Sequence, residues 1–274
     1  MKNILLIAGS VTGGIIIAVL VLTLLLLGIL TLIFMPSEQK VSLDTKDKSI
    51  DELKSLAAWV KYDCPEEVKN KSISQPQSGS GVLWSVSGTQ AKIITNRHVL
   101  DCASNITDSC SESIAERAQI RLSNGKLYNA SEIRFAPASL DLVLLTIELR
   151  EGDVFNSSLT FRNSSLDVGD RVIAVSYPGF AEKVVEFVVA EGTVSKHHDL
   201  LTSDGLLFKG ISSDAYASFG SSGGGLFDDK GNLVGIISFG SINSEEITAI
   251  DVMQVKESID TGAFAPCLSA YGNA

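Results

Sequence analysis

The sequence predicts an all-β domain of antiparallel strands, a sandwich or a barrel, that follows one long apolar N-terminal segment. From Gly79 onward, short β-branched and aromatic runs recur about every 8–15 residues, with Gly, Asn or Asp turns between them, which is typical of antiparallel strands. Little of this region has the 3.6-residue period of a helix. The strands are expected at 82–86, 91–95, 119–122, 126–129, 142–149, 171–176, 184–189, 206–211, 226–227, 233–238 and 246–250, before a final helix over 252–259.

Two turns support the antiparallel assignment. Ser87-Gly88-Thr89-Gln90 separates the first two expected strands, which indicates a hairpin. Asn124-Gly125 separates the next two, and this dipeptide is the strongest short-range signal for a two-residue hairpin turn.

The N-terminal segment is apolar enough to cross a membrane. No charged residue occurs from Ile4 to Met35, and a spanning helix needs roughly 20 apolar residues. The run ends at Pro36 without the small-residue cleavage site of a secretory signal peptide. We expect residues 1–36 to be an uncleaved transmembrane anchor, with a long cleaved signal peptide as the alternative.

Residues 37–78 are expected to be a juxtamembrane linker that contains a short helix. Ser49 can cap this helix because Glu52 follows it by three residues. Its apolar face would consist of Leu53, Leu56, Ala57 and Val60, and Pro65 would end it. Residues 79–274 then form the globular domain.

The cysteines indicate the compartment. Cys64, Cys102, Cys110 and Cys267 have no CxxC or Cys/His metal spacing, and four cysteines allow three disulfide pairings. We expect Cys102–Cys110 and Cys64–Cys267, with four buried free thiols as the alternative. Disulfide bonds would place the domain on the extracytoplasmic (periplasmic or extracellular) side of a single-pass anchor. The lysines on either side of the apolar segment do not favour this orientation.

The charge balance excludes one class of partner. Without Lys2, the only charged residue of the anchor, 21 of the 22 basic residues remain against 32 acidic ones, a net charge of about −11. Nucleic-acid binding needs a basic surface. We therefore expect no nucleic-acid partner.

Three residues have the side chains of a nucleophilic triad. Ser222 lies in Gly220-Ser221-Ser222-Gly223-Gly224, where glycines allow backbone N–H groups to point into one concavity; a flexible Gly/Ser turn is the alternative. His98 follows an apolar strand, and Asp141 begins another. A buried carboxylate needs a partner, and an imidazole N–H can provide it.

The order His98, Asp141, Ser222 is that of the chymotrypsin-type enzymes, and the chain resembles trypsin-like serine peptidases of the HtrA (Deg) branch. The resemblance covers roughly Gly79 to Ile259. Its motifs occur in the family's order and are Gly79-Ser80-Gly81, Thr95-Asn96-Arg97-His98-Val99, Asp141-Leu142-Val143-Leu144-Leu145, Val168-Gly169-Asp170-Arg171-Val172 and Gly220-Ser221-Ser222-Gly223-Gly224.

This resemblance implies two six-stranded antiparallel Greek-key β-barrels with the active site between them. It makes Ser222 the nucleophile, His98 the general base and acid, and Asp141 the orienting carboxylate. The backbone N–H groups of Gly220 and Ser222 would form the oxyanion hole. Substrate would bind at a pocket floor that includes Tyr216 and along the strand Ile237, Ser238, Phe239 and Gly240. We expect no cofactor and no metal. The adjacent His197-His198 cannot both face one ion without a third ligand, and we interpret them as part of a loop.

The sequence also departs from the HtrA pattern. Ser221 and Gly225 stand where that branch usually has Asn and Pro, and its C-terminal PDZ domain is not expected here. We expect a membrane-anchored serine endopeptidase that acts through an acyl-enzyme on extended or unfolded polypeptide. The alternative is a catalytically silent trypsin-fold protein that binds peptides or acts as a scaffold. The sequence indicates no oligomeric state.

Overall fold

The computed structural model describes residues 48–64, 77–100, 117–137, 139–155, 158–179, 186–201, 207–240 and 246–265, all within one compact unit, Leu43–Ala274. The expected anchor, residues 1–36, lies outside the described residues, as do Cys102, Cys110 and Cys267. In the described part of the chain, no helix has the length and apolar character that a membrane span requires.

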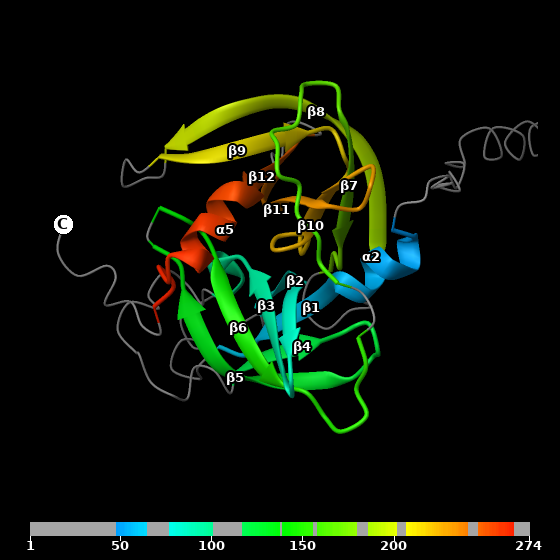
Figure 1. Cartoon of the computed structure of the whole chain (residues 1–274), viewed down its shortest axis with the longest axis vertical. Helices are drawn as coiled ribbons and strands as arrows, with labels where there is room; N and C mark the ends of the chain where they lie inside the picture. Colours follow the sequence, from blue (N-terminus) through cyan, green and yellow to red (C-terminus); the bar gives the residue numbers. More distant parts are fainter. Residues whose placement is uncertain are drawn as a thin grey trace, which may run out of the picture. The chain divides into compact units, whose positions relative to one another are not determined.

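The described chain forms two closed six-stranded antiparallel barrels, one from β1–β6 and one from β7–β12 (Figure 1). The strand order is β1-β2-β3-β6-β5-β4 in the first barrel and β10-β11-β12-β9-β8-β7 in the second, which is the same connectivity used twice. The elements are α2 (Ile50–Leu56), β1 (Ala57–Tyr62), β2 (Gln77–Ser87), β3 (Gln90–Thr95), the 3-10 turn η1 (Arg97–Leu100), β4 (Ala118–Arg121), β5 (Leu127–Phe135), β6 (Val143–Glu148), β7 (Arg171–Ser176), β8 (Val188–Leu201), β9 (Leu207–Ser213), β10 (Gly225–Asp228), β11 (Leu233–Gly240), β12 (Ile247–Asp251) and α5 (Val252–Asp260).

The helix expected in the linker is present but shorter than predicted. Ser49 and Glu52 form the predicted capping box. The helix ends at Leu56, not near Pro65, and the chain continues directly as β1, which pairs with β2 and β4. The prediction that Ala57 and Val60 belong to the helix was therefore wrong, and the first barrel begins ahead of Gly79.

Three apolar clusters hold the two barrels and join them. One lies within the first barrel and one within the second. The third contains Val82 and Ile94 from the first barrel with Ile173 and Phe227 from the second. Leu53 of α2 is fully buried in this shared cluster, so α2 helps to fix one barrel against the other.

Most predicted strands are confirmed within a few residues, including both hairpins. The largest difference is β8, which runs to Leu201 and includes His197 and His198. The interpretation of these histidines as part of a loop was wrong. Burial lowers the pKa of His198, and its two buried ring nitrogens have no hydrogen-bond partner among the residues that the structure describes.

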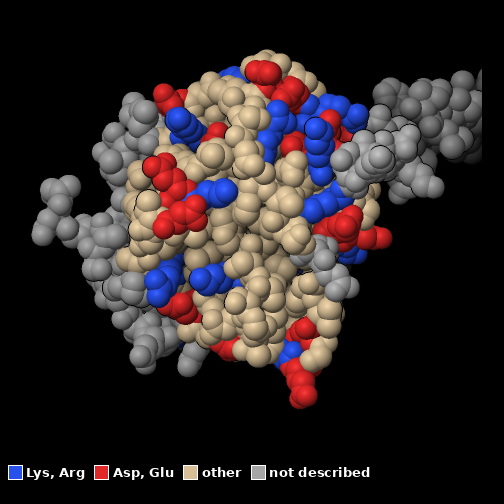
Figure 2. Space-filling model, in the orientation of Figure 1, with Lys and Arg blue, Asp and Glu red and all other residues tan. Residues whose placement is uncertain are grey.

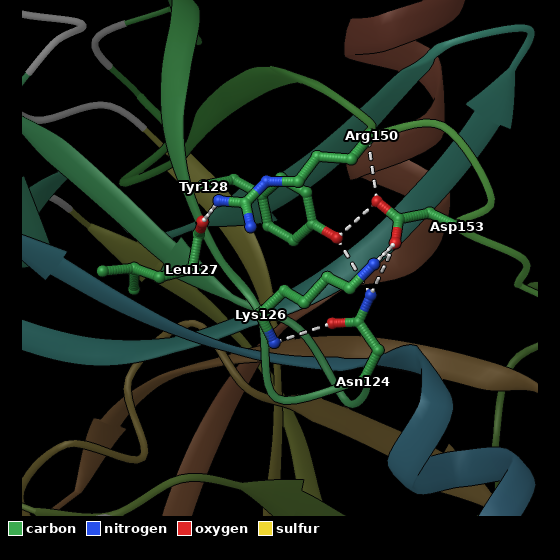
Figure 3. A network of polar contacts seen from close by, with 6 residues as sticks. All are labelled: Asn124, Lys126, Leu127, Tyr128, Arg150 and Asp153. Carbon is green, nitrogen blue, oxygen red and sulfur yellow. Dashed lines mark hydrogen bonds and ion pairs between the residues drawn. The ribbon is translucent and has the colours of Figure 1, made fainter.

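A polar network closes the turn after β6 against the turn before β5 (Figure 3). The Asp153 carboxylate accepts hydrogen bonds from Lys126 Nζ, Tyr128 Oη and the Arg150 N–H. The hydrogen bonds from Lys126 and Tyr128 are the largest causes that lower the pKa of Asp153 to about 2. Because this carboxylate is only 1 % exposed, the network holds these two turns of the first barrel together.

The charged side chains are mixed in sign over the face shown in Figure 2, where Lys and Arg lie among Asp and Glu. The described part of this face shows no continuous basic surface.

Candidate active site

His98 and Asp141 lie against each other at the ends of two neighbouring strands. β3 and β6 pair so that Thr95 lies opposite Val143, and this pairing brings the residues that follow β3 next to those that precede β6. The His98 Nδ1 atom is 2.5 Å from Asp141 Oδ2. The backbone N–H of His98 donates to Asp141 Oδ1 at 3.0 Å, so one carboxylate binds both the ring and the main chain of the histidine.

The rest of Asp141 is held from two sides. Asn96 Nδ2 and the Arg97 N–H donate to its backbone carbonyl, at 2.9 and 3.2 Å. Ser238 on β11 donates its hydroxyl to Asp141 Oδ2 at 2.9 Å. This last bond crosses from the second barrel to the first. The side chain of Asp141 is 21 % exposed and that of His98 is 44 % exposed, so the free edge of the imidazole faces solvent.

The loop that contains Ser222 requires glycine at two positions. Gly220 has φ +92° and Gly223 has φ +85°, which side chains of L-residues adopt at a cost. A Cβ on Gly223 would lie 2.1 Å from the Ser80 carbonyl oxygen, and one on Gly220 would lie 2.5 Å from the Gly179 nitrogen. The glycine cluster is therefore required by backbone conformation and by close approach.

Four successive carbonyl groups of this loop, from Phe219 to Ser222, accept hydrogen bonds. The oxygens of Phe219 and Gly220 accept from the Gly179 N–H (3.0 Å) and the Ser80 hydroxyl (2.8 Å). Those of Ser221 and Ser222 accept from the N–H groups of Gly224 (2.9 Å) and Ser80 (2.7 Å). Because four successive carbonyls have donors, the planes of four successive peptide groups are fixed.

The N–H groups of the same loop are occupied with two exceptions. Those of Ser221, Gly223 and Gly224 donate to the carbonyls of Ser218, Ile237 and Ser221. The N–H groups of Gly220 and Ser222 have no partner among the described residues. Unpaired backbone donors are rare, and two of them two residues apart are suited to bind an oxygen that carries negative charge.

Gly79 lies between the residue that follows His98 and the main chain of Ser222. A Cβ on Gly79 would contact both the Val99 side chain and the Ser222 carbonyl oxygen, so the residue after His98 and the main chain of Ser222 lie on either side of this glycine. Between the side chains of His98 and Ser222 themselves, the structure shows no hydrogen bond.

The sequence model of the family described as trypsin-like peptidase domain matches residues 79–236, more than half of the chain. The chain belongs to this family.

The relatives of this trypsin-like domain are Do-like proteases. It is 29 % identical over 187 residues to a serine protease Do-like HtrA of Lactobacillus helveticus, covering 68 % of this chain and 41 % of that protein. It is 31 % identical over 160 residues to the chloroplastic Protease Do-like 8 of Arabidopsis thaliana, covering 57 % and 34 %. The chain thus spans about two fifths or less of the length of these relatives.

Solved structures share the fold of the trypsin-like domain. The active form of the Rv3671c protease from M. tuberculosis has a TM-score of 0.60 at 15 % identity, covering 81 % of this chain and 86 % of that one. The HtrA-type protease AlgW, solved with a tripeptide, has a TM-score of 0.60 at 21 % identity, covering 78 % and 62 %.

The residues predicted to bind substrate differ in how far they are exposed. Ser238 is buried against Asp141, whereas Tyr216, expected in a pocket floor, is 65 % exposed. A pocket floor is enclosed, so this exposure argues against a floor position for the ring. Ile237 is buried, and its N–H and carbonyl bond to Gly224 and Gly223.

The strand segment Ser238–Gly240 has one open edge. β11 pairs with β10 only through Leu233 to Ile236, and its other side pairs with β12 as far as Gly240. On the β10 side, Ser238–Gly240 therefore has no strand partner among the described residues. An open edge can pair with an extended peptide.

The roles of four residues of this site were not predicted from the sequence, although two of them, Asn96 and Ser80, stand in the quoted motifs; the four are Asn96, Ser176, Ser78 and Ser80. Ser176 donates its hydroxyl to that of Ser221, and both serines are buried. A serine or asparagine next to a glycine or histidine motif is the available signal, but their roles depend on contacts between residues distant in the sequence.

Cys64 is the cysteine that the structure describes. It is buried and disulfide-bonded. Its partner lies outside the described residues, so both predicted pairings stay predictions.

Proposed function

We propose that this chain is a serine endopeptidase that hydrolyses peptide bonds through an acyl-enzyme. The observation that carries the proposal is the pair of N–H groups at Gly220 and Ser222 that have no partner among the described residues, in a loop whose carbonyls from Phe219 to Ser222 are all hydrogen-bonded. Such a pair matches the tetrahedral oxyanion of acyl transfer. Membership of the trypsin-like peptidase family supports the same chemistry.

In this proposal, Ser222 Oγ attacks the carbonyl carbon of the scissile bond while His98 Nε2 takes the hydroxyl proton. Because Asp141 Oδ2 faces Nδ1, it holds the proton there and leaves Nε2 free to accept. The oxyanion forms against the N–H groups of Gly220 and Ser222. Collapse breaks the C–N bond, and His98 returns its proton to the departing amine. A water molecule, deprotonated by His98, then attacks the Ser222 ester; the C–O bond breaks, the acid product leaves, and His98 returns the proton to Ser222 Oγ.

The substrate class follows from the open edge of Ser238–Gly240. A polypeptide must be extended to pair with a strand edge, and a folded protein seldom offers an extended segment of several residues with free backbone groups. We therefore propose extended or unfolded polypeptide as the substrate.

The test compares the full chain with Ser222→Ala on a reduced and alkylated protein substrate, with peptide products identified by mass spectrometry. We expect internal cleavages with the wild type and none with the variant, while both show the same thermal unfolding. Equal cleavage by both would refute the assignment of Ser222. A folded wild type that binds the substrate without cleaving it would favour the alternative of a silent peptide-binding or scaffold protein.

We further propose that residues 1–36 anchor the peptidase domain on the extracytoplasmic side of a membrane. The support is the uncharged run from Ile4 to Met35 and the disulfide-bonded state of Cys64, because disulfides persist outside the cytosol. The full chain is expected to stay with membranes after alkaline carbonate extraction. Release into the carbonate supernatant would contradict the anchor, and alkylation of all four cysteines without reductant would contradict the compartment.

A further inference from the structure

Strand β2 of the first barrel holds the oxyanion loop of the second. Ser80 is fully buried on β2. Its hydroxyl, its N–H and its carbonyl each form a hydrogen bond that is not a backbone bond between paired strands. Its hydroxyl donates to the Gly220 carbonyl at 2.8 Å and accepts from the Tyr177 N–H at 2.8 Å. Its own N–H donates to the Ser222 carbonyl at 2.7 Å, and its carbonyl accepts from Thr95 Oγ1 at 2.6 Å.

Ser78 extends this contact along the same strand. Residues two apart on a strand point to the same side, and the hydroxyl of Ser78 donates to the Gly179 carbonyl at 3.0 Å. Gly179 in turn donates its N–H to the Phe219 carbonyl at 3.0 Å. Two serines on β2 are thus connected to the loop, Ser80 by direct hydrogen bonds and Ser78 through Gly179.

These bonds fix the peptide plane that carries the Gly220 N–H and the planes on either side of the peptide that carries the Ser222 N–H. In a trans peptide the carbonyl and the following N–H point in opposite directions. Because the Phe219 carbonyl is held by Gly179, the Gly220 N–H is turned away from Gly179. Gly220 has no side chain to prevent rotation of this peptide plane, so external bonds must prevent it.

We propose that Ser80, assisted by Ser78, is a positioning residue for the oxyanion hole. This inference rests on the proposed peptidase function and adds to it a residue of the other barrel that acts through the loop without touching substrate. Ser80 connects the carbonyls on either side of the Ser222 N–H with Thr95, which precedes His98 by three residues. It therefore sets the hole and the histidine strand relative to each other.

Removal of the Ser80 hydroxyl should weaken stabilisation of the transition state without weakening binding of the substrate. Removing an oxyanion-hole donor costs about 10²–10³-fold in kcat. Ser80→Ala leaves the donors in place but frees the Gly220 carbonyl, so we expect kcat to fall by about tenfold, with KM changed by less than about twofold. Affinity for a peptide boronic acid, which forms a tetrahedral adduct on serine, should fall by the same factor as kcat.

The matched control is Ser212→Ala. Ser212 is also buried, but it lies on β9 outside the loop; its alanine variant loses one hydroxyl bond, to Thr248, whereas Ser80→Ala loses two, with Gly220 and Tyr177. We expect its kcat and its boronate affinity to equal those of the wild type. Thermal unfolding of each variant separates loss of fold from loss of positioning.

The outcomes separate the two claims. In one outcome the wild type is active, and Ser80→Ala keeps full kcat or shows a raised KM with unchanged kcat. Either result overturns the positioning role and leaves the peptidase proposal standing. A folded wild type without turnover or boronate binding overturns both. If Ser80→Ala does not fold, half-buried Ser78→Ala decides: a smaller fall in kcat, about threefold, with a parallel fall in boronate affinity supports the proposal, and an unchanged kcat overturns it.

Discussion

Asp141→Asn is expected to reduce kcat by about 10⁴-fold while the chain stays folded. The carboxylate accepts from the His98 N–H at Oδ1 and contacts His98 Nδ1 and Ser238 Oγ at Oδ2. An asparagine amide must place its NH₂ group at one of these two positions. At the Oδ1 position it would meet the His98 N–H donor to donor, which leaves a donor unsatisfied at a cost of about 1–3 kcal/mol.

At the Oδ2 position the NH₂ group can keep its partners, because the Ser238 hydroxyl can accept and Nδ1 can accept in the other tautomer. That tautomer carries its proton on Nε2, so His98 can no longer take the proton of Ser222. A 10⁴-fold loss corresponds to about 5.4 kcal/mol of activation free energy, at 1.36 kcal/mol for each factor of ten.

The assay is kcat on a peptide substrate together with the rate of covalent modification by a fluorophosphonate, and both should fall. The control is Asp229→Asn, the same chemical change at an exposed aspartate of the turn after β10, which should leave both unchanged. A loss of less than about tenfold in a folded Asp141→Asn protein would refute the assignment of the proton to Nδ1.

Three further predictions concern stability, measured as the free energy of unfolding in urea. Gly223→Ala should cost clearly more than Gly125→Ala, because Gly125 has a similar φ of +76° but a Cβ there would meet nothing within 4 Å. Gly125→Ala should cost about 1–2 kcal/mol. Equal losses of stability would contradict the contact with Ser80. Because the folded pKa of Asp153 is lowered to about 2 from 3.8, its stabilisation is present above pH 3.8 and is lost as the pH falls toward 2. The stability difference between wild type and Asp153→Asn should therefore shrink over that interval, and a constant difference would be the contrary result. Leu53→Ala should cost about 2–5 kcal/mol, against almost nothing for Met253→Ala at a position 46 % exposed; a loss below about 1 kcal/mol would show that α2 does not join the barrels.

The parts of the fold that depend on local signals were predictable. Asn124-Gly125 gives a hairpin because Gly125 adopts φ +76° without strain. Ser49 and Glu52 cap α2 because both partners lie within one turn. Such signals require no knowledge of distant residues.

β1 was not predictable because its pattern fits two structures. Leu53 and Leu56 are buried at helical spacing, and Val60 continues that spacing. In the structure Val60 is buried for another reason, the period-two burial of a strand that pairs with β2 and β4. Only that long-range pairing distinguishes a strand from a longer helix.

In the candidate site, residue types were predictable and supporting contacts were not. A nucleophile motif indicated Ser222, and the cost of burying a carboxylate suggested a partner for Asp141. The role of Ser80 depends on the approach of two barrels at residues about 140 positions apart in the chain. No periodicity or spacing reports such an approach.

The most direct test of an activated Ser222 is to map the adduct formed when the full chain reacts with a fluorophosphonate. This reagent labels a serine that a base has activated. We predict one adduct, on the peptide that contains Ser222, and no adduct in Ser222→Ala. A folded wild type without an adduct, or an adduct that persists in Ser222→Ala, would contradict the account.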